Sequence, residues 1–211
     1  MLTKLLSSDD LKRFLLFAEL LSISDKTLLW DGKNPKEITS INGAEKISIT
    51  KGEAESKLLS DWRESAKDAP PKNVMEHVLL HILKDIPLYD CITKPEVVQW
   101  NAISSALRFL LNDCVQYQQQ PDETGLKIQI TNEKNPKNVA DGAQNPYALR
   151  IMVYELMLMA LADGQISPIE FQFLEEFKRY HKVDDYAFDE IRERAENMYR
   201  ETQKTIALVL E

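Results

Sequence analysis

Glycine is scarce in this chain, and its spacing excludes the phosphate-binding loops of nucleotide enzymes. Only 6 of the 211 residues are Gly, at positions 32, 43, 52, 125, 142 and 164. The motifs G-x-G-x-x-G and G-x-x-x-x-G-K-[ST] need closely spaced glycines, because the backbone must approach the phosphates. No two glycines here lie within five positions of each other, so neither motif is present.

Cysteine and long hydrophobic runs are also in short supply. Cys91 and Cys114 are too few for a disulfide scaffold, and their spacing fits no zinc motif. The longest apolar stretch, residues 151–162, contains Glu155 and is shorter than the roughly 18 residues of a membrane span. Asp9 and Asp10 follow the start too closely for a signal peptide. We therefore expect a cytoplasmic protein without direct membrane insertion.

Positive charge is in the minority. There are 34 acidic against 26 basic side chains, which gives a formal net charge of -8. An acidic chain does not attract the phosphate backbone, so no nucleic-acid partner is expected. Hydrophobic residues make up 44% of the chain, enough to bury a core.

Apolar residues recur mostly at helical spacing, which predicts an all-α bundle. The expected helices begin near Ser8 and at residues 53, 73, 95, 147, 168 and 185. The one starting near residue 95 is expected to continue through Tyr117, with Trp100 in the core. Residues 147–162 are apolar nearly all round, so this helix should be central and the most buried.

A small β element interrupts the helical pattern. Residues 38–41 and 47–50 alternate around Asn42-Gly43, which predicts a β-hairpin. Residues 126–131 also alternate, and we expect this strand to pair with the hairpin.

The best-defined local pattern lies after the central helix. Asp163-Gly164 ends that helix, and Ser167-Pro168-Ile169-Glu170 is a capping box that starts the next one. Together with Leu158 to Ala162, this segment resembles the signature of the TerB-like, tellurite-resistance-associated helical domains. In that family an apolar helix ends in Ala-Asp-Gly, and the following helix opens with Glu.

The resemblance implies a single TerB-like domain over residues 1–211, best matched at residues 147–185. It implies an all-α bundle of two similar halves, with polar insertions near residues 26–71 and 119–146. The first half departs from the pattern, since neither Asp25-Lys26 nor Asp31-Gly32 with Glu37 has the expected spacing. The implied function is a non-enzymatic stress-response protein with an acidic, metal-binding surface or a protein partner.

A divalent-cation site follows from combining the resemblance with one physical argument. The resemblance carries Asp163 and Glu170 as ligands. Glu155 is added because a carboxylate inside an apolar helix costs several kcal/mol unless it is paired or bound to a metal. Oxygen ligands favour a hard cation such as calcium. The segment is not an EF-hand, since Met159 and Leu161 fall where that loop needs oxygen ligands.

Interpretations of these carboxylates that need no metal ion also stay open. Asp163 and Glu170 fit a turn followed by a capping box without any ion. Arg150 is five residues before Glu155, a poor spacing for a pair on one helix face. A partner from another helix, or a backbone amine at a helix start, is therefore favoured for Glu155.

Two other function classes compete with the metal-binding reading. A plain helical adaptor would take an amphipathic partner helix in a groove and need no metal. A metal-dependent enzyme would use His77, His81 and Asp85, which share one helix face, together with Glu155. That face lies opposite the apolar residues of its helix, so we expect it to be solvated. His181 is expected to be structural, at a helix end that favours a cation.

Overall fold

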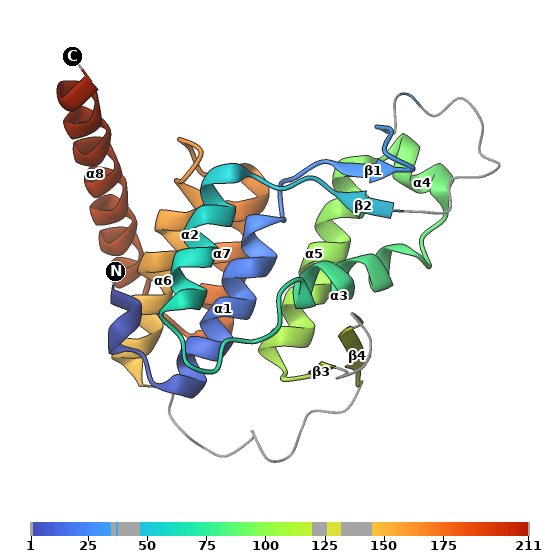
Figure 1. Cartoon of the computed structure of the whole chain (residues 1–211), viewed down its shortest axis with the longest axis horizontal. Helices are drawn as coiled ribbons and strands as arrows, with labels where there is room; N and C mark the ends of the chain where they lie inside the picture. The colour runs from blue at the N-terminus through green and yellow to red at the C-terminus, as the bar shows by residue number, and fades with distance from the viewer. Residues whose placement is uncertain (1, 35–36, 38–46, 120–125, 132–144, 211) are drawn as a thin grey trace.

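A computed structural model describes residues 2–34, 37, 47–119, 126–131 and 145–210. Most of them are helical, and the described strands form two small antiparallel sheets (Figure 1). None of the described helices is long and apolar enough to span a membrane. The helices are α1 (Ser8–Ser22), α2 (Glu53–Glu64), α3 (Val74–Leu83), α4 (Leu88–Thr93), α5 (Pro95–Leu111), α6 (Pro146–Ala160), α7 (Pro168–His181) and α8 (Asp185–Leu210), preceded by a 3₁₀ turn, η1 (Leu2–Leu5).

The core lies where α1 and α6 pack against each other. α2 and α7 flank this pair, α3 and α5 extend the bundle to one side, and α8 packs on α6 at the other side (Figure 1). The expectation of a central helix near residues 147–162 is confirmed by α6, whose Val153, Leu156 and Met159 are fully buried. α1 shares this central position, with Phe14 and Leu20 equally buried.

The strands pair differently from the sequence prediction. β2 (Ile47–Ile49) pairs with β1 (Leu28–Trp30), whereas residues 38–46 lie outside the described part. β4 (Leu126–Ile130) pairs with β3 (Val115–Gln119), so the expected pairing with the earlier hairpin is wrong.

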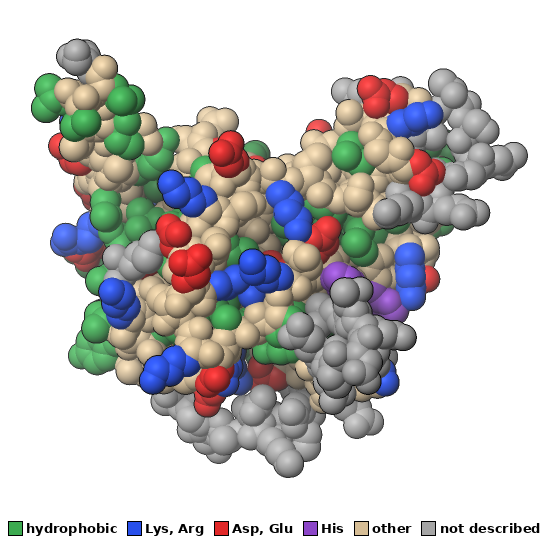
Figure 2. All heavy atoms as spheres, viewed as in Figure 1, with side chains coloured by type: hydrophobic (Ala, Val, Ile, Leu, Met, Phe, Trp, Pro, Cys, Tyr) green, Lys and Arg blue, Asp and Glu red, His purple; other side chains and the backbone are tan. Residues whose placement is uncertain are grey.

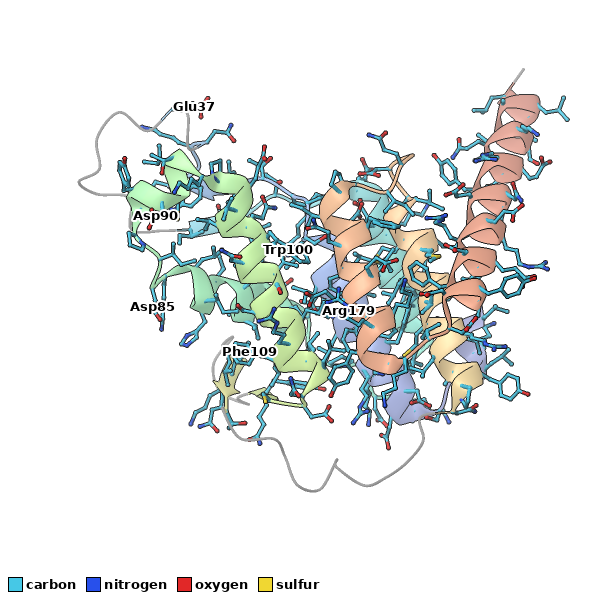
Figure 3. All side chains as sticks on the ribbon, turned by 180° about the vertical axis from the view of Figure 1, so that it is seen from behind. Glu37, Asp85, Asp90, Trp100, Phe109 and Arg179 are labelled. Atoms are coloured by element: carbon cyan, nitrogen blue, oxygen red, sulfur yellow. The ribbon has the colours of Figure 1, made fainter. Side chains whose placement is uncertain are left out.

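The helix predicted to reach Tyr117 ends earlier, at Leu111. Asp113 adopts a left-handed conformation with a φ of 54°, which turns the chain into β3. Val115 and Tyr117 alternate with polar residues, and pairing with β4 overrides the helical spacing of this segment. Trp100, predicted to lie in the core, is only half-buried and packs against the core from α5; Figure 3 shows it on the side of α5 that faces the central helices.

The C-terminal helices start as their caps predict. Ser167 and Glu170 form both hydrogen bonds of the capping box at α7. Asp184 accepts a hydrogen bond from the amide of Ala187 at the start of α8. His181 differs from the expectation of a cation. Burial, assisted by the Arg13 guanidinium, lowers the pKa of His181 to about 4, so this imidazole is neutral at pH 7.

Candidate functional site

Three carboxylates from separate parts of the chain meet at one end of the central helices. The ligand oxygens of Asp25, Glu55 and Glu170 all lie within 4.8 Å of one another. Asp25 follows α1, whereas Glu55 and Glu170 belong to the first turns of α2 and α7. Glu55 and Glu170 are only 2% and 1% exposed. We call these three residues and Asp163 the carboxylate cluster.

The cluster has the same plan in both halves of the bundle. Asp25 lies three residues after the end of α1, and Asp163 lies three residues after the end of α6. Glu55 is the third residue of α2, just as Glu170 is the third residue of α7. Because α1 packs on α6, the two Asp–Glu pairs are brought to one place. The Asp and Glu residues therefore occupy the same positions relative to the helix ends in α1–α2 as in α6–α7.

Lys26 supplies a cation inside this cluster. Its Nζ lies 2.9 Å from Asp25 Oδ1 and 3.4 Å from Asp163 Oδ2, and it also pairs closely with Glu55. The Lys26 side chain is 13% exposed. Burial alone would lower its pKa, but the hydrogen bonds to Glu55 and Asp25 outweigh burial and raise the pKa above its usual range. One ammonium thus faces carboxylates from both halves.

Local structure fixes the two glutamates. Glu170 Oε2 accepts a hydrogen bond of 2.8 Å from the amide of Ser167, which holds the side chain back over the start of α7. Glu55 also folds back over the N-cap of its helix, Gly52. A Cβ at position 52 would collide with the Glu55 carboxylate in its present position, so a larger residue there would require this side chain to shift.

Glu170 is the carboxylate whose proton affinity is most affected by this environment. Burial raises the pKa of Glu170 to about 8, and the nearby Asp25 and Asp163 charges act in the same direction. The hydrogen bonds from Ser167 oppose the shift without cancelling it. At neutral pH this carboxyl therefore still carries a proton in much of the protein, and an arriving cation would release it.

The structure brings together some of the predicted ligands and separates others. Glu170 lies in the cluster, and Asp163 is joined to it through Lys26. Glu155 lies elsewhere, since its carboxylate accepts a hydrogen bond from the backbone amide of Leu2. This confirms the expectation that a backbone amine at a helix start pairs with Glu155. Of the two turns considered in the first half, Asp25-Lys26 reaches the cluster, whereas Glu37 caps a local turn at Asn34.

The histidine face remains at the surface. His77 and His81 are exposed on α3, as predicted, and Figure 2 shows histidine side chains at the molecular surface. His77 Nδ1 lies 2.6 Å from the carbonyl oxygen of Asn73. Among the described residues, the potential metal ligands that converge within 4.8 Å are Asp25, Glu55 and Glu170, and they do not include this face.

Sequence reasoning missed Glu55 and the role of Lys26. A signal for Glu55 was present, since it follows an N-cap glycine by three residues, just as Glu170 follows Ser167. β1, β2 and their connection lie between Asp25 and α2. Asp25 and Glu55 are therefore 30 positions apart in the sequence, whereas Asp163 and Glu170 are 7 positions apart. Because of this insertion, the similar placement of the two Asp–Glu pairs is not apparent from the sequence.

Comparison with known proteins adds no relative: no family model, curated protein or solved structure matches this chain.

Proposed function

We propose that the protein is a non-enzymatic, TerB-like stress-response protein whose carboxylate cluster binds a divalent cation such as calcium. Asp25, Glu55 and Glu170 would be the principal ligands, with Asp163 at the exposed edge of the site. The proposal keeps Asp163 and Glu170 from the sequence analysis and replaces Glu155 by Asp25 and Glu55.

The observation that carries the proposal is the spacing of the carboxylate oxygens. Ca²⁺ takes oxygen ligands at about 2.3–2.6 Å, so two ligands on opposite sides of the ion lie about 5 Å apart. The oxygens of Asp25, Glu55 and Glu170 lie within 4.8 Å of one another, which fits such an ion. Carboxylates suit calcium, magnesium or manganese better than zinc or copper.

The similar placement of the two Asp–Glu pairs is a second line of support for the family. The resemblance implies two similar halves, and both halves here combine a helix, a following Asp and a glutamate in the next helical turn. The match to the sequence signature covers the second half, so Asp25 and Glu55 extend it to the first. A role in tellurite resistance or other stress responses rests on the resemblance.

The Lys26 ammonium would compete with a divalent cation for the carboxylates of the site. The ammonium lies against Asp25, Glu55 and Asp163, so an entering divalent cation would have to displace it. A divalent cation carries two positive charges, whereas the Lys26 ammonium carries one, so the divalent cation compensates the clustered carboxylates better. An abundant divalent cation would therefore displace the ammonium. The structure of the cluster therefore predicts moderate affinity and a dependence on pH through Glu170.

A melting experiment tests the proposed function. Millimolar calcium should raise the melting temperature of the wild type, and Asp163→Asn combined with Glu170→Gln should abolish that rise, because the amides keep the shape but remove the charge. Glu175→Gln is a matched control, since Glu175 belongs to α7 outside the cluster. An unchanged melting temperature in the wild type at pH 8 would contradict the proposal.

A helical adaptor without metal is a second candidate, favoured by the end of α8. Leu208, Val209 and Leu210 are 75%, 76% and 80% exposed, and Figure 1 shows this end of α8 extending beyond the other helices. An amphipathic partner helix would bury such side chains. Replacing Leu208 and Val209 by Ser should then change the free energy of unfolding by less than about 0.5 kcal/mol. A larger loss would mean that these side chains stabilise the isolated fold.

A further inference from the structure

A hollow lies between α1, α2 and the start of α3, apart from the carboxylate cluster, and its lining combines charged and hydroxyl side chains with the apolar Ile23 and Leu59. Its volume is about 210 Å³. Glu19 and Ser22 come from α1, and Ser56, Ser60 and Arg63 come from one face of α2. We call it the α1–α3 pocket.

The floor of the pocket is a buried ion pair. Arg63 Nη2 donates to Glu19 Oε2 over 2.6 Å, and the side chains are 8% and 6% exposed. Arg63 also donates to the carbonyl oxygens of Pro70 and Pro71, which fixes the guanidinium in place. Glu19 accepts a further hydrogen bond from the amide of Met75. A floor held by this many bonds is preformed and does not need a ligand to assemble it.

The rim of the pocket is exposed and carries an excess of positive charge. Lys51 Nζ lies 2.6 Å from Glu76 Oε2 and donates to Asn73, so this lysine is held at the opening. Lys72 is exposed and forms no ion pair with another described residue. The lining thus holds three cations against two carboxylates, in a chain whose net charge is -8. Figure 2, which views the molecule from the α2 side, shows Lys and Arg side chains beside carboxylates over this region.

Partial protonation of Glu19 adds to the excess of positive charge in the pocket. Burial raises the pKa of Glu19 to about 7, against the opposing influence of Arg63. At neutral pH the floor therefore carries part of a positive charge in addition to that of Lys72. Serine hydroxyls at positions 56 and 60 stand one helical turn apart on the wall and supply hydrogen-bond donors beside these cations.

We propose that the α1–α3 pocket binds a compact ligand through an oxyanion, either a phosphate or a carboxylate group. Lys72 and Lys51 would attract the charge, and Ser56 and Ser60 would donate hydrogen bonds to the oxygens. The volume is below the roughly 300–1,000 Å³ of sites for drug-sized molecules, which favours a ligand of a few carbons. This proposal is independent of cation binding, because it uses none of the cluster's carboxylates.

Calorimetric titration tests the proposal, with glycerol 3-phosphate and succinate as probes in a buffer free of both groups, at constant ionic strength and pH 7.5. At least one probe should bind with one site per chain. The stronger of the two identifies the group, phosphate or carboxylate, and either result supports the proposal. Chemical shifts of the Ser22, Ser56 and Ser60 amides should move with the same saturation curve.

Two variants locate the binding site. Lys72→Met removes the unpaired rim charge, and Ser60→Leu fills the hollow; each should weaken binding about tenfold or more. Lys67→Met is the matched control, because Lys67 is exposed and does not line the pocket, and it should leave affinity unchanged. Since Lys72 is exposed, its variant should fold normally, and this keeps the test valid if Ser60→Leu does not. Absence of saturable binding for both probes, or equal weakening by Lys67→Met and Lys72→Met, would overturn the proposal.

Discussion

Removing the Lys26 ammonium should reveal what the carboxylate cluster prefers as its cation. In Lys26→Met the side chain keeps nearly the same length but loses the charge that faces Asp25, Glu55 and Asp163. Glu55 is only 2% exposed, so its carboxylate is left buried without its cation. Without divalent ions we expect the free energy of unfolding to fall sharply.

The size of this loss follows from the burial of the partners. Removing one member of a buried ion pair costs about 3–5 kcal/mol, because the other charge stays buried without compensation. The Lys26 side chain is 13% exposed and Asp163 is 42% exposed, so water partly screens the cluster. We therefore expect about 3 kcal/mol, near the lower limit. Calcium at a hundred times its dissociation constant would return about 2.7 kcal/mol, which offsets most of the loss.

Urea unfolding at pH 8 measures both quantities, once with a chelator and once with calcium. Lys57→Met is the matched control, because Lys57 is exposed on the same helix as Glu55 and lies outside the cluster. Its free energy of unfolding should match that of the wild type within about 0.5 kcal/mol. A loss below about 1 kcal/mol for Lys26→Met in chelator, or a calcium stabilisation of this variant no larger than that of the wild type, would contradict this role of Lys26.

Three further predictions concern pH, packing and capping. Between pH 6.5 and 8 the free energy of unfolding should fall as pH rises, because the folded pKa of Glu170 is about 8 against 4.5 unfolded; its stabilising contribution is complete below pH 4.5 and is lost as pH passes 8. Glu170→Gln should flatten this slope in urea titrations without divalent ions, and an unchanged slope would remove Glu170 as its source. Leu156→Ala or Met159→Ala should cost about 2–4 kcal/mol in urea unfolding, because both side chains are fully buried in α6; unchanged midpoints would show that α6 is not central. Ser167→Ala should lower the free energy of unfolding by about 1 kcal/mol, with or without calcium, because it removes one half of the capping box. A loss confined to calcium-free protein would instead tie Ser167 to the ion.

The sequence predicts most helices of this fold, because local residues determine where they begin, but it does not predict α4 and it extends α5 beyond Leu111. The capping box at Ser167 and the apolar stripe of α6 lie where the pattern indicates. The strand partners are less predictable, because pairing depends on residues distant in the chain. Leu28–Trp30 carries no turn signal that links it to Ile47–Ile49, and Val115 to Gln119 follows directly on a helical stripe.

In the candidate site too, the sequence identifies some residues, whereas others are brought together only by the fold. Asp163 and Glu170 lie within one contiguous segment, so the sequence alone identifies them as a pair. Asp25 and Glu55 are separated by β1 and β2, and they meet because α2 packs against α1. Glu155 attracts attention as a charge in an apolar helix, but a backbone amide far away in the sequence, that of Leu2, satisfies it. Burial of a carboxylate therefore indicates a partner without indicating which one.

A crystal structure of the protein grown with calcium at pH 8 would test the central claim most directly. We predict an ion coordinated by the carboxylates of Asp25, Glu55 and Glu170, with the Lys26 ammonium moved away from Asp25 and Glu55. A Lys26 ammonium still paired with both carboxylates, and no ion between them at saturating calcium, would contradict it.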